Sequence, residues 1–260
     1  MTTLTALRNT WEDLAGRDAL GAILTDPAKV GGKWSVADFM ATGHTEIETV
    51  FNYLAEIDHV PRFDGTALDF GCGVGRLTQA MARRFTTSIG VDISQQMIQI
   101  AESWNQNKQC SYAIVPDARL PFADETFSFI YSNIVLQHVP RKYSIAYLRE
   151  FERVLVPGGI LVFGVQDRFA APDWAARIVR IRHILRIRSR MRALVGRSKG
   201  EMQMHCLPER SVRGALISAK VMDVQLTNTA AKDFNGRLEY LSQAPIRGYI
   251  GKQYCAIKER

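Results

Sequence analysis

The sequence predicts an α/β fold in which a doubly wound, mainly parallel sheet of seven strands carries helices on both faces. Three observations support this prediction. Short apolar runs alternate with helical patterns, a glycine-rich turn joins one such run directly to a helix between Ala67 and Thr78, and aspartates end two further runs at Asp92 and Asp117. In doubly wound sheets the carboxyl ends of the strands meet at one edge and form the ligand site.

Length and composition fit one globular domain with an insertion: the chain has 260 residues, of which 47% are hydrophobic. No apolar run reaches the roughly 18 residues of a membrane-spanning helix, and the N-terminus lacks the basic-then-apolar pattern of a signal peptide. The four cysteines have no C-x-x-C spacing, so we expect neither a zinc site nor a disulfide framework. Together these features predict a cytoplasmic protein.

The first sixty residues show helical patterns on both sides of a break that contains Pro27, Gly31 and Gly32. The second pattern, from Val36 to Ile57, has an apolar face. Thr42, Gly43 and His44 interrupt it, which predicts either a loop that reaches the active site or a plain turn between two helices. We expect this extension, residues 1–60, to pack on the sheet edge or to cover a bound ligand.

The stretch from Ala67 to Thr78, ALDFGCGVGRLT, predicts a strand, a tight turn and a helix N-terminus. Glycine suits the turn because the backbone can adopt positive φ and a ligand can lie directly against it. A dinucleotide fingerprint would require a third glycine where this chain has Arg76, so NAD and FAD are disfavoured. The acidic residue followed by G-x-G-x-G, at Asp69, Gly71, Gly73 and Gly75, resembles the first motif of class I S-adenosylmethionine-dependent methyltransferases.

A helix from Arg76 to Phe85 is expected next, followed by a second strand that ends at Asp92, with Ser94 as the N-cap of another helix. A carboxylate about 20 residues beyond the glycine turn can accept hydrogen bonds from two ribose hydroxyls, although turn chemistry alone would also explain it. Ile93 and Met97 could form apolar walls for an adenine ring or simply pack in the core.

A third strand, from Cys110 to Val115, precedes the run D-A-x-x-L-P-F-x-D-x-x-F between Asp117 and Phe127. This run resembles the third and fourth motifs of the methyltransferase type 11 group, which includes enzymes of ubiquinone and menaquinone biosynthesis. The resemblance covers about residues 66–165. It implies a Rossmann-like methyltransferase fold and S-adenosyl-L-methionine as cofactor. The cofactor-binding residues that it implies are Asp69, Gly71, Cys72, Gly73, Gly75, Arg76, Asp92, Ile93, Met97, Asp117, Ala118, Asn133 and Ile134.

Within that resemblance, Asp117 would meet the adenine amino group, and the backbone around Asn133 and Ile134 would hold the methionine moiety. A helix from Tyr143 to Leu155 and the closing residues Pro157, Gly158 and Gly159 match a family element whose role is structural. A fifth strand from Ile160 to Val165 follows and completes a cofactor-binding core at residues 61–167.

The C-terminal part, residues 207–260, is expected to complete the sheet. It supplies a helix from Pro208 to Ser218 and strands near Val221–Leu226 and Gly248–Ile257. The resemblance to class I methyltransferases implies that these two strands form a terminal antiparallel hairpin. The connection from Asn228 to Arg247 is long enough to contribute to the mouth of a substrate site.

Residues 168–206 form an insertion that the common fold does not explain. From Trp174 to Gly200 the chain has eight arginines, one lysine and no Asp or Glu, and without those nine charges the formal +7 becomes −2. Apolar residues at helical spacing predict a basic helix over residues 174–199. The family resemblance implies that an insertion after the fifth strand acts as a lid over the substrate. Anionic membrane lipid, a phosphorylated or otherwise acidic substrate, and acids elsewhere in the fold remain alternative partners. Nucleic acid is disfavoured because stacking aromatics are nearly absent.

For the chemistry, methyl transfer needs positioning and, for a hydroxyl acceptor, a base within reach. His138, after the fourth strand, is the candidate base, with His44 and His205 as alternatives; His138 could instead only shape the pocket. No metal-ligand spacing occurs, so we expect no catalytic metal. The sequence thus predicts O-methylation of a small molecule, glycan or lipid-linked intermediate. Carbon methylation of a quinone-like ring and a non-catalytic cofactor-binding protein are the alternatives, and the oligomeric state is not readable.

Overall fold

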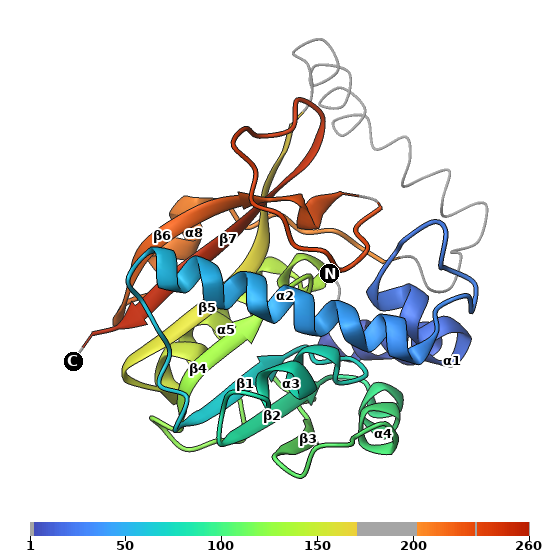
Figure 1. Ribbon diagram of the computed structural model, residues 1–260. Helices are drawn as coiled ribbons and strands as arrows, with labels where there is room; N and C mark the ends of the chain where they lie inside the picture. The colour runs from blue at the N-terminus through green and yellow to red at the C-terminus, as the bar shows by residue number, and fades with distance from the viewer. Residues whose placement is uncertain (1–2, 171–201, 232, 260) are drawn as a thin grey trace.

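The computed structural model describes residues 3–170, 202–231 and 233–259 (Figure 1). In chain order the elements are α1 (Leu4–Ile23), α2 (Val36–Glu56), β1 (Thr66–Phe70), α3 (Arg76–Met81), β2 (Thr87–Asp92), α4 (Gln95–Ser103), β3 (Cys110–Ile114), β4 (Phe127–Ser132), η1 (Leu136–His138), α5 (Arg141–Val154), β5 (Leu155–Ala170), α8 (Glu209–Ala215), β6 (Ala219–Thr227), η2 (Asn228–Ala230) and β7 (Gly248–Lys258).

The sheet has seven strands in the order β3-β2-β1-β4-β5-β7-β6. The pairs from β3 to β5 are parallel, and β7 runs antiparallel to both of its neighbours. This confirms the predicted α/β fold and its terminal hairpin. The chain winds outward from β1 to β3 and then returns to β4 on the other side of β1. A crevice at the carboxyl ends of β1 and β4 is therefore the expected ligand site.

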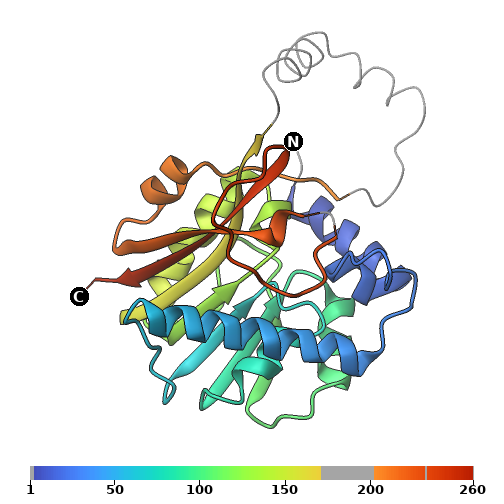
Figure 2. The ribbon, with the colours of Figure 1, turned by 45° about the horizontal axis from the view of Figure 1, so that its top comes forward.

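Helices cover both faces of the sheet (Figures 1 and 2). Alternate strand residues point to opposite faces: Ala67 and Phe129 belong to the hydrophobic cluster with α2 and α3, whereas Leu68 and Ile130 belong to the cluster with α5 and α8. Side chains from α1, α4 and the start of α2 form a third cluster at the end of the sheet that carries β2. Among the described helices, none is long and apolar enough to cross a membrane.

The interruption predicted at Thr42, Gly43 and His44 is wrong, because α2 continues through all three residues. A Cβ at Gly43 would lie 2.4 Å from the carbonyl oxygen of Arg76. Glycine is therefore present because α2 crosses the first turn of α3 at close range. In a sequence, a glycine that forms a turn cannot be distinguished from a glycine that allows two helices to cross closely.

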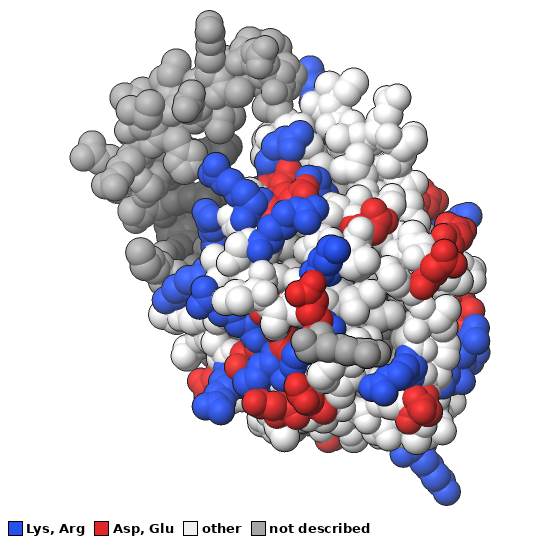
Figure 3. Space-filling view, turned by 90° about the vertical axis from the view of Figure 1, so that its left-hand side faces the viewer, with Lys and Arg blue, Asp and Glu red and all other residues white. Residues whose placement is uncertain are grey.

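Several element bounds differ from the predicted ones. α3 ends at Met81, before the predicted Phe85, since the amides of Arg84 and Phe85 both bond the Met81 carbonyl and close a turn. β5 extends to Ala170, which pairs with Gly248 of β7. The predicted basic helix over residues 174–199 lies outside the described residues. On the described surface in Figure 3, basic and acidic side chains are interspersed.

Candidate functional site

A cavity of about 370 Å³ lies at the carboxyl edge of the sheet. Its lining comes from the glycine turn after β1, the ends of β2 and β3, the segment after β4, helix α1, the residues before α8, and the connection between β6 and β7. The lining residues are Leu7, Trp11, Ala22, Ile23, Thr25, Phe70, Gly71, Gly73, Val91, Asp92, Ile93, Met97, Val115, Ile134, Val135, Gln137, His138, Val139, Tyr147, Met202, Met204, Thr229, Ala230, Ala231, Phe234 and Tyr249. The volume is within the range of small-molecule and cofactor sites.

The glycine turn presents backbone to this cavity. Gly71, Gly73 and Gly75 have φ of 78°, 52° and 83°, as the sequence pattern predicted. The amides of Gly71 and Cys72 bond the Val91 carbonyl at 2.8 and 2.9 Å, which ties the turn to β2. At Gly73 a Cβ would also lie 2.6 Å from Ile23 of α1. A side chain at Gly73 is therefore disfavoured by the positive φ, and it would also displace the end of the Ile23 side chain.

Asp92 ends β2 and faces the cavity. Its Oδ2 accepts the Gly73 amide and its Oδ1 the Ser94 amide, both at 2.9 Å. Burial raises the pKa of the Asp92 carboxyl, although these amides act in the opposite direction. Each carboxylate oxygen has two lone pairs, so both can still accept a hydroxyl donor from a ligand. Asp92 is thus oriented as an acceptor for two adjacent hydroxyls, and the neighbouring Ile93 and Met97 line the same cavity.

Helix α1 is fastened over this end of the cavity by Glu12, which sequence reasoning missed. The Glu12 carboxylate accepts the Ser94 hydroxyl at 3.1 Å and the amides of Gln95 and Gln96 at 2.6 and 3.2 Å. A carboxylate is favoured there because the first amides of a helix have no intrahelical partner. Glu12 thereby holds α1, with its cavity-lining Trp11, against the N-terminus of α4.

Three of the predicted cofactor residues lie beneath the turn and do not line the cavity. Asp69 is buried and accepts the Thr78 hydroxyl at 2.6 Å, and burial raises the pKa of its carboxyl to about 7. Burial likewise raises the pKa of the Cys72 thiol. Arg76 is 3% exposed and forms an ion pair with Glu46, Nη1 to Oε2, at 2.8 Å. These side chains support the turn from below. Gly75 is not among the lining residues either, and a Cβ there would lie 2.5 Å from the Tyr112 hydroxyl.

Glu46 of α2, also missed by the sequence reasoning, connects this turn to the end of β4. Its fully buried carboxylate pairs with Arg76, and its Oε1 accepts the Tyr131 hydroxyl at 2.9 Å and the Asn133 Nδ2 amide at 2.8 Å. Asn133 in turn accepts the Ile134 amide at 3.0 Å. Ile134 has a φ of 54°, which is unusual for a β-branched residue. Glu46 therefore supports both backbone segments that meet at the crevice, while only Ile134 of the two β4-end residues lines it.

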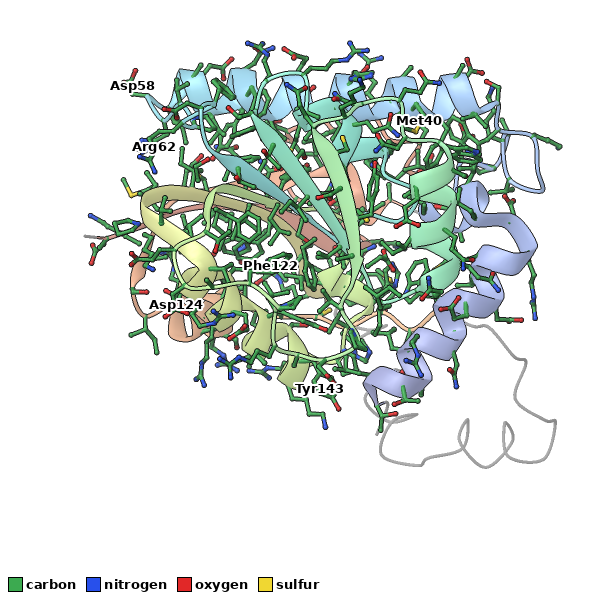
Figure 4. The ribbon with its side chains drawn as sticks, turned by 90° about the horizontal axis from the view of Figure 1, so that it is seen from below. Met40, Asp58, Arg62, Phe122, Asp124 and Tyr143 are labelled. Atoms are coloured by element: carbon green, nitrogen blue, oxygen red, sulfur yellow. The ribbon has the colours of Figure 1, made fainter. Side chains whose placement is uncertain are left out.

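Asp117 and Ala118, the predicted adenine contacts, are not among the cavity-lining residues. Asp117 is exposed, and its carbonyl accepts the Tyr147 hydroxyl at 3.1 Å. The segment behind them is fastened by Arg153, which donates to the carbonyls of Leu120 and Phe122 and to the carboxylate of Asp124. Figure 4 shows Phe122 and Asp124 on this segment. The predicted structural role of the closing element around Arg153 is consistent with these bonds.

His138 lines the cavity as an uncharged side chain. Its Nδ1 lies 3.2 Å from the Gln203 carbonyl and its Nε2 3.2 Å from Gln137 Nε2. Because a carbonyl can only accept, Nδ1 carries the proton and Nε2 accepts from the amide. Burial lowers the pKa of His138 to about 4. The ring also contacts Trp11 edge-on, with centroids 5.5 Å apart. The one lone pair of this imidazole is therefore engaged, and its basicity is weak.

The alternative histidines are not among the lining residues. His44 lies on α2, where burial lowers its pKa. The His205 amide bonds the Gln137 carbonyl at 2.7 Å, and burial lowers the pKa of its ring as well. Its neighbour Met204 does line the cavity, as do Thr229 and Phe234 of the connection after β6. That connection thus contributes to the site.

The methyltransferase domain family matches residues 68–163. The chain is 36% identical over 108 residues to the demethylmenaquinone methyltransferase of Tropheryma whipplei, covering 40% of this chain and 44% of that one. It is 30% identical over 128 residues to the ubiquinone biosynthesis O-methyltransferase of Idiomarina loihiensis, covering 47% and 51%. The chain thus spans about half the length of these relatives. Magnesium protoporphyrin IX methyltransferase from Synechocystis PCC 6803 has a similar fold, with a TM-score of 0.59 and 16% identity over 98% and 99% of the two chains.

Proposed function

We propose that this chain is an enzyme that transfers a methyl group from S-adenosyl-L-methionine to a small-molecule, glycan or lipid-linked acceptor. The match of residues 68–163 to the methyltransferase domain family supports this proposal. The observation that carries the proposal is the carboxylate of Asp92, fixed by the Gly73 and Ser94 amides and facing the cavity beside the glycine turn. An acceptor-only group in that position suits the two ribose hydroxyls of the cofactor.

The lining fits this cofactor in three parts. Asp92 would hold the ribose, Ile93 and Met97 would contact the adenine, and the backbone of the glycine turn and Ile134 would face the methionine moiety. When bound, S-adenosylmethionine supplies a methyl group on a sulfonium sulfur, which an acceptor lone pair takes by in-line displacement. The role of the chain is to hold the two partners in line and to exclude water, with α1 covering the cofactor.

We propose an oxygen atom as the methyl acceptor, with carbon methylation of a quinone-like ring as the second candidate. Both kinds of enzyme occur among the relatives, as the O-methyltransferase of ubiquinone biosynthesis and the demethylmenaquinone methyltransferase. Incubation with methyl-labelled cofactor and candidate acceptors distinguishes them, because NMR of the product separates an O-methyl from a C-methyl carbon.

The primary test is calorimetric titration of the protein with S-adenosylhomocysteine, with NADH as the matched nucleotide control. We expect saturable binding of S-adenosylhomocysteine and none of NADH. Binding of NADH alone, or of neither, would refute the proposed function. Binding without transfer to any acceptor would favour the non-catalytic alternative.

The general-base role of His138 stays a prediction, and the pH profile of turnover tests it. If His138 removes a proton, His138→Ala should lower turnover by about 10²- to 10⁴-fold with little change in cofactor affinity. Because burial lowers its pKa to about 4, an acid limb that belongs to His138 should lie near pH 4. A limb near 6.5 that disappears in the variant would contradict the buried, neutral imidazole.

An anionic membrane surface remains a proposed partner of the basic segment at residues 174–199. We likewise propose that the protein associates peripherally with such a membrane. The segment's arginines Arg182, Arg186 and Arg190 lie outside the described residues. Replacing all three by Gln should reduce binding to phosphatidylserine vesicles, or raise the acceptor KM, and leave cofactor affinity unchanged. If none of these quantities changes, the arginines serve a solvated or internally paired surface.

A further inference from the structure

We propose that Tyr147 of α5 determines the specificity of the cavity for an aminopurine, because its hydroxyl oxygen accepts a hydrogen bond from the amino group of the cofactor's adenine. This proposal rests on the proposed function, since it concerns the base end of the same cavity. It assigns to Tyr147 the contact that the family resemblance implied for Asp117. The ligand class that it selects is a purine nucleoside with an amino group at C6.

The base of the cofactor belongs at the β3 side of the cavity. Asp92 at the end of β2 would hold the ribose, and the methionine moiety would face the glycine turn and Ile134. The ribose joins the methionine moiety and the adenine from opposite sides. In the sheet order β3-β2-β1-β4, β3 is the neighbour of β2 that lies away from β1. Val115, which follows β3, lines the cavity there, and its amide bonds the Asp92 carbonyl at 2.9 Å.

Tyr147 reaches this place from the α5 face of the sheet. Its ring packs against Phe70, the last residue of β1, with centroids 4.6 Å apart. Its hydroxyl donates to the carbonyl of Asp117, beyond β3, at 3.1 Å. Tyr147 is 3% exposed and lines the cavity. Among the described lining residues from the ends of β2 and β3 and from α4 and α5, Asp92 and Tyr147 are the two with a polar side chain.

The hydrogen bonds of the Tyr147 hydroxyl decide which ligand group it can meet. A phenol has one proton, and that proton is used by the Asp117 carbonyl, which can only accept. Burial raises the pKa of the phenol, and the carboxyls of Asp117 and Asp92 act in the same direction, so the hydroxyl keeps this proton. The oxygen retains its lone pairs, and within the described residues no group donates to it. It therefore offers an acceptor, which suits an amino group and disfavours an oxygen at the same place.

Asp117 is less suited to this contact. It is exposed and outside the cavity lining, so a hydrogen bond to its carboxylate would compete with water. The buried phenol of Tyr147 does not face that competition, and a hydrogen bond is electrostatically stronger away from water. The contribution of Asp117 is its backbone carbonyl, which orients the Tyr147 hydroxyl.

The first experiment compares S-adenosylhomocysteine with an analogue in which purine replaces adenine, so that hydrogen stands at C6 in place of the amino group. Both are titrated calorimetrically into the parent protein. We expect the amino group to tighten binding by about three- to tenfold. Equal affinities would overturn this proposal and leave the proposed function intact. Binding of neither ligand would overturn both.

The second experiment repeats the two titrations with Tyr147→Phe, which keeps the ring and removes the hydroxyl. Because Asp117 is exposed, water can replace the hydroxyl at its carbonyl, and we expect the variant to fold. The preference for S-adenosylhomocysteine should fall to about twofold or less, with nearly unchanged affinity for the purine analogue. If Tyr147 only positioned the segment at Asp117, both affinities would fall together and the preference would persist. That result would overturn the proposal.

Two further variants complete the test. The control Tyr143→Phe removes a hydroxyl from the same helix but outside the cavity lining, and it should keep the preference of the parent (Figure 4). Asp117→Ala removes the carboxylate and keeps the carbonyl that orients Tyr147, so the preference should persist there as well. An equal loss of preference in Tyr143→Phe and Tyr147→Phe would overturn the proposal. So would a loss in Asp117→Ala with the preference retained in Tyr147→Phe, because the amino group would then belong to Asp117.

Discussion

Removing the carboxylate of Glu46 should destabilise the protein far more than removing a carboxylate two residues along the same helix. Glu46 and Arg76 are 0% and 3% exposed and 2.8 Å apart, and Glu46 also accepts from Tyr131 and Asn133. In Glu46→Leu the guanidinium stays buried without a countercharge, which costs about 3–5 kcal/mol. The freed hydroxyl and amide add to this loss. Against a total stability of about 5–15 kcal/mol, this is a large effect.

The matched control is Glu48→Leu. Glu48 pairs with Arg84 at 3.1 Å, but both side chains are about half exposed, at 52% and 48%. Such surface pairs contribute about 0–1 kcal/mol. The two variants therefore differ in burial while sharing helix α2 and the type of ion pair. Urea unfolding followed by circular dichroism gives the free energy of unfolding of each.

A double-mutant cycle with Arg76→Met separates the ion pair from general damage to the core. If the loss in Glu46→Leu comes from an orphaned guanidinium, the double variant should be more stable than Glu46→Leu alone, with a coupling energy of about 2 kcal/mol or more. Additive losses within about 0.5 kcal/mol would refute this reasoning. The Kd for S-adenosylhomocysteine should weaken in Glu46→Gln even where the fold is kept, because the turn and Ile134 lose their shared support.

Three further predictions follow from single contacts. Asp92→Asn should weaken S-adenosylhomocysteine binding by about 1.5–3 kcal/mol, or roughly 10- to 150-fold. Asp117→Asn, at an exposed position outside the cavity lining, should leave the calorimetric Kd nearly unchanged. Equal losses of affinity in both variants would favour the adenine contact at Asp117. The carboxyl of Asp69 has its pKa raised by burial from 3.8 to about 7, so the folded state binds more protons than the unfolded state between these values and the contribution of Asp69 to stability falls as pH rises from 4 to 7. In urea unfolding, the free energy of unfolding of Asp69→Asn relative to the parent should therefore increase from pH 5 to pH 8. A decrease of this difference over the same pH range would contradict the raised pKa of Asp69. Gly43→Ala should lower the thermal midpoint, because its Cβ would lie 2.4 Å from the Arg76 carbonyl oxygen, whereas Gly214→Ala in α8, with nothing within 4 Å, should keep or raise it; similar shifts in both variants would remove the close-crossing argument.

The sequence by itself determined the frame of the cofactor site. The glycine turn after β1, the aspartate at the end of β2 and the N-cap of α4 are readable because each rests on a local requirement: positive φ, a strand end, or a free helix amide. The positions of Gly71, Gly73 and Asp92 in the cavity follow from these requirements together with the alternation of strands and helices. The same alternation predicted the parallel part of the sheet, and the family resemblance predicted the antiparallel terminal hairpin, whereas the strand order β3-β2-β1-β4-β5-β7-β6 comes from the tertiary structure.

Only the tertiary structure decided which side chains support this frame. Glu12 caps a helix more than 80 positions away, and Glu46 bonds residues 85 and 87 positions away. No local pattern marks such partners, because a charged residue on an amphipathic helix normally faces solvent. His138 shows the same limit: its position after β4 is readable, but its weak basicity comes from burial and from Gln137 and Gln203, which meet it only in the folded chain. Sequence fixes what the backbone must do locally, whereas desolvation and long-range pairing arise when distant segments pack together.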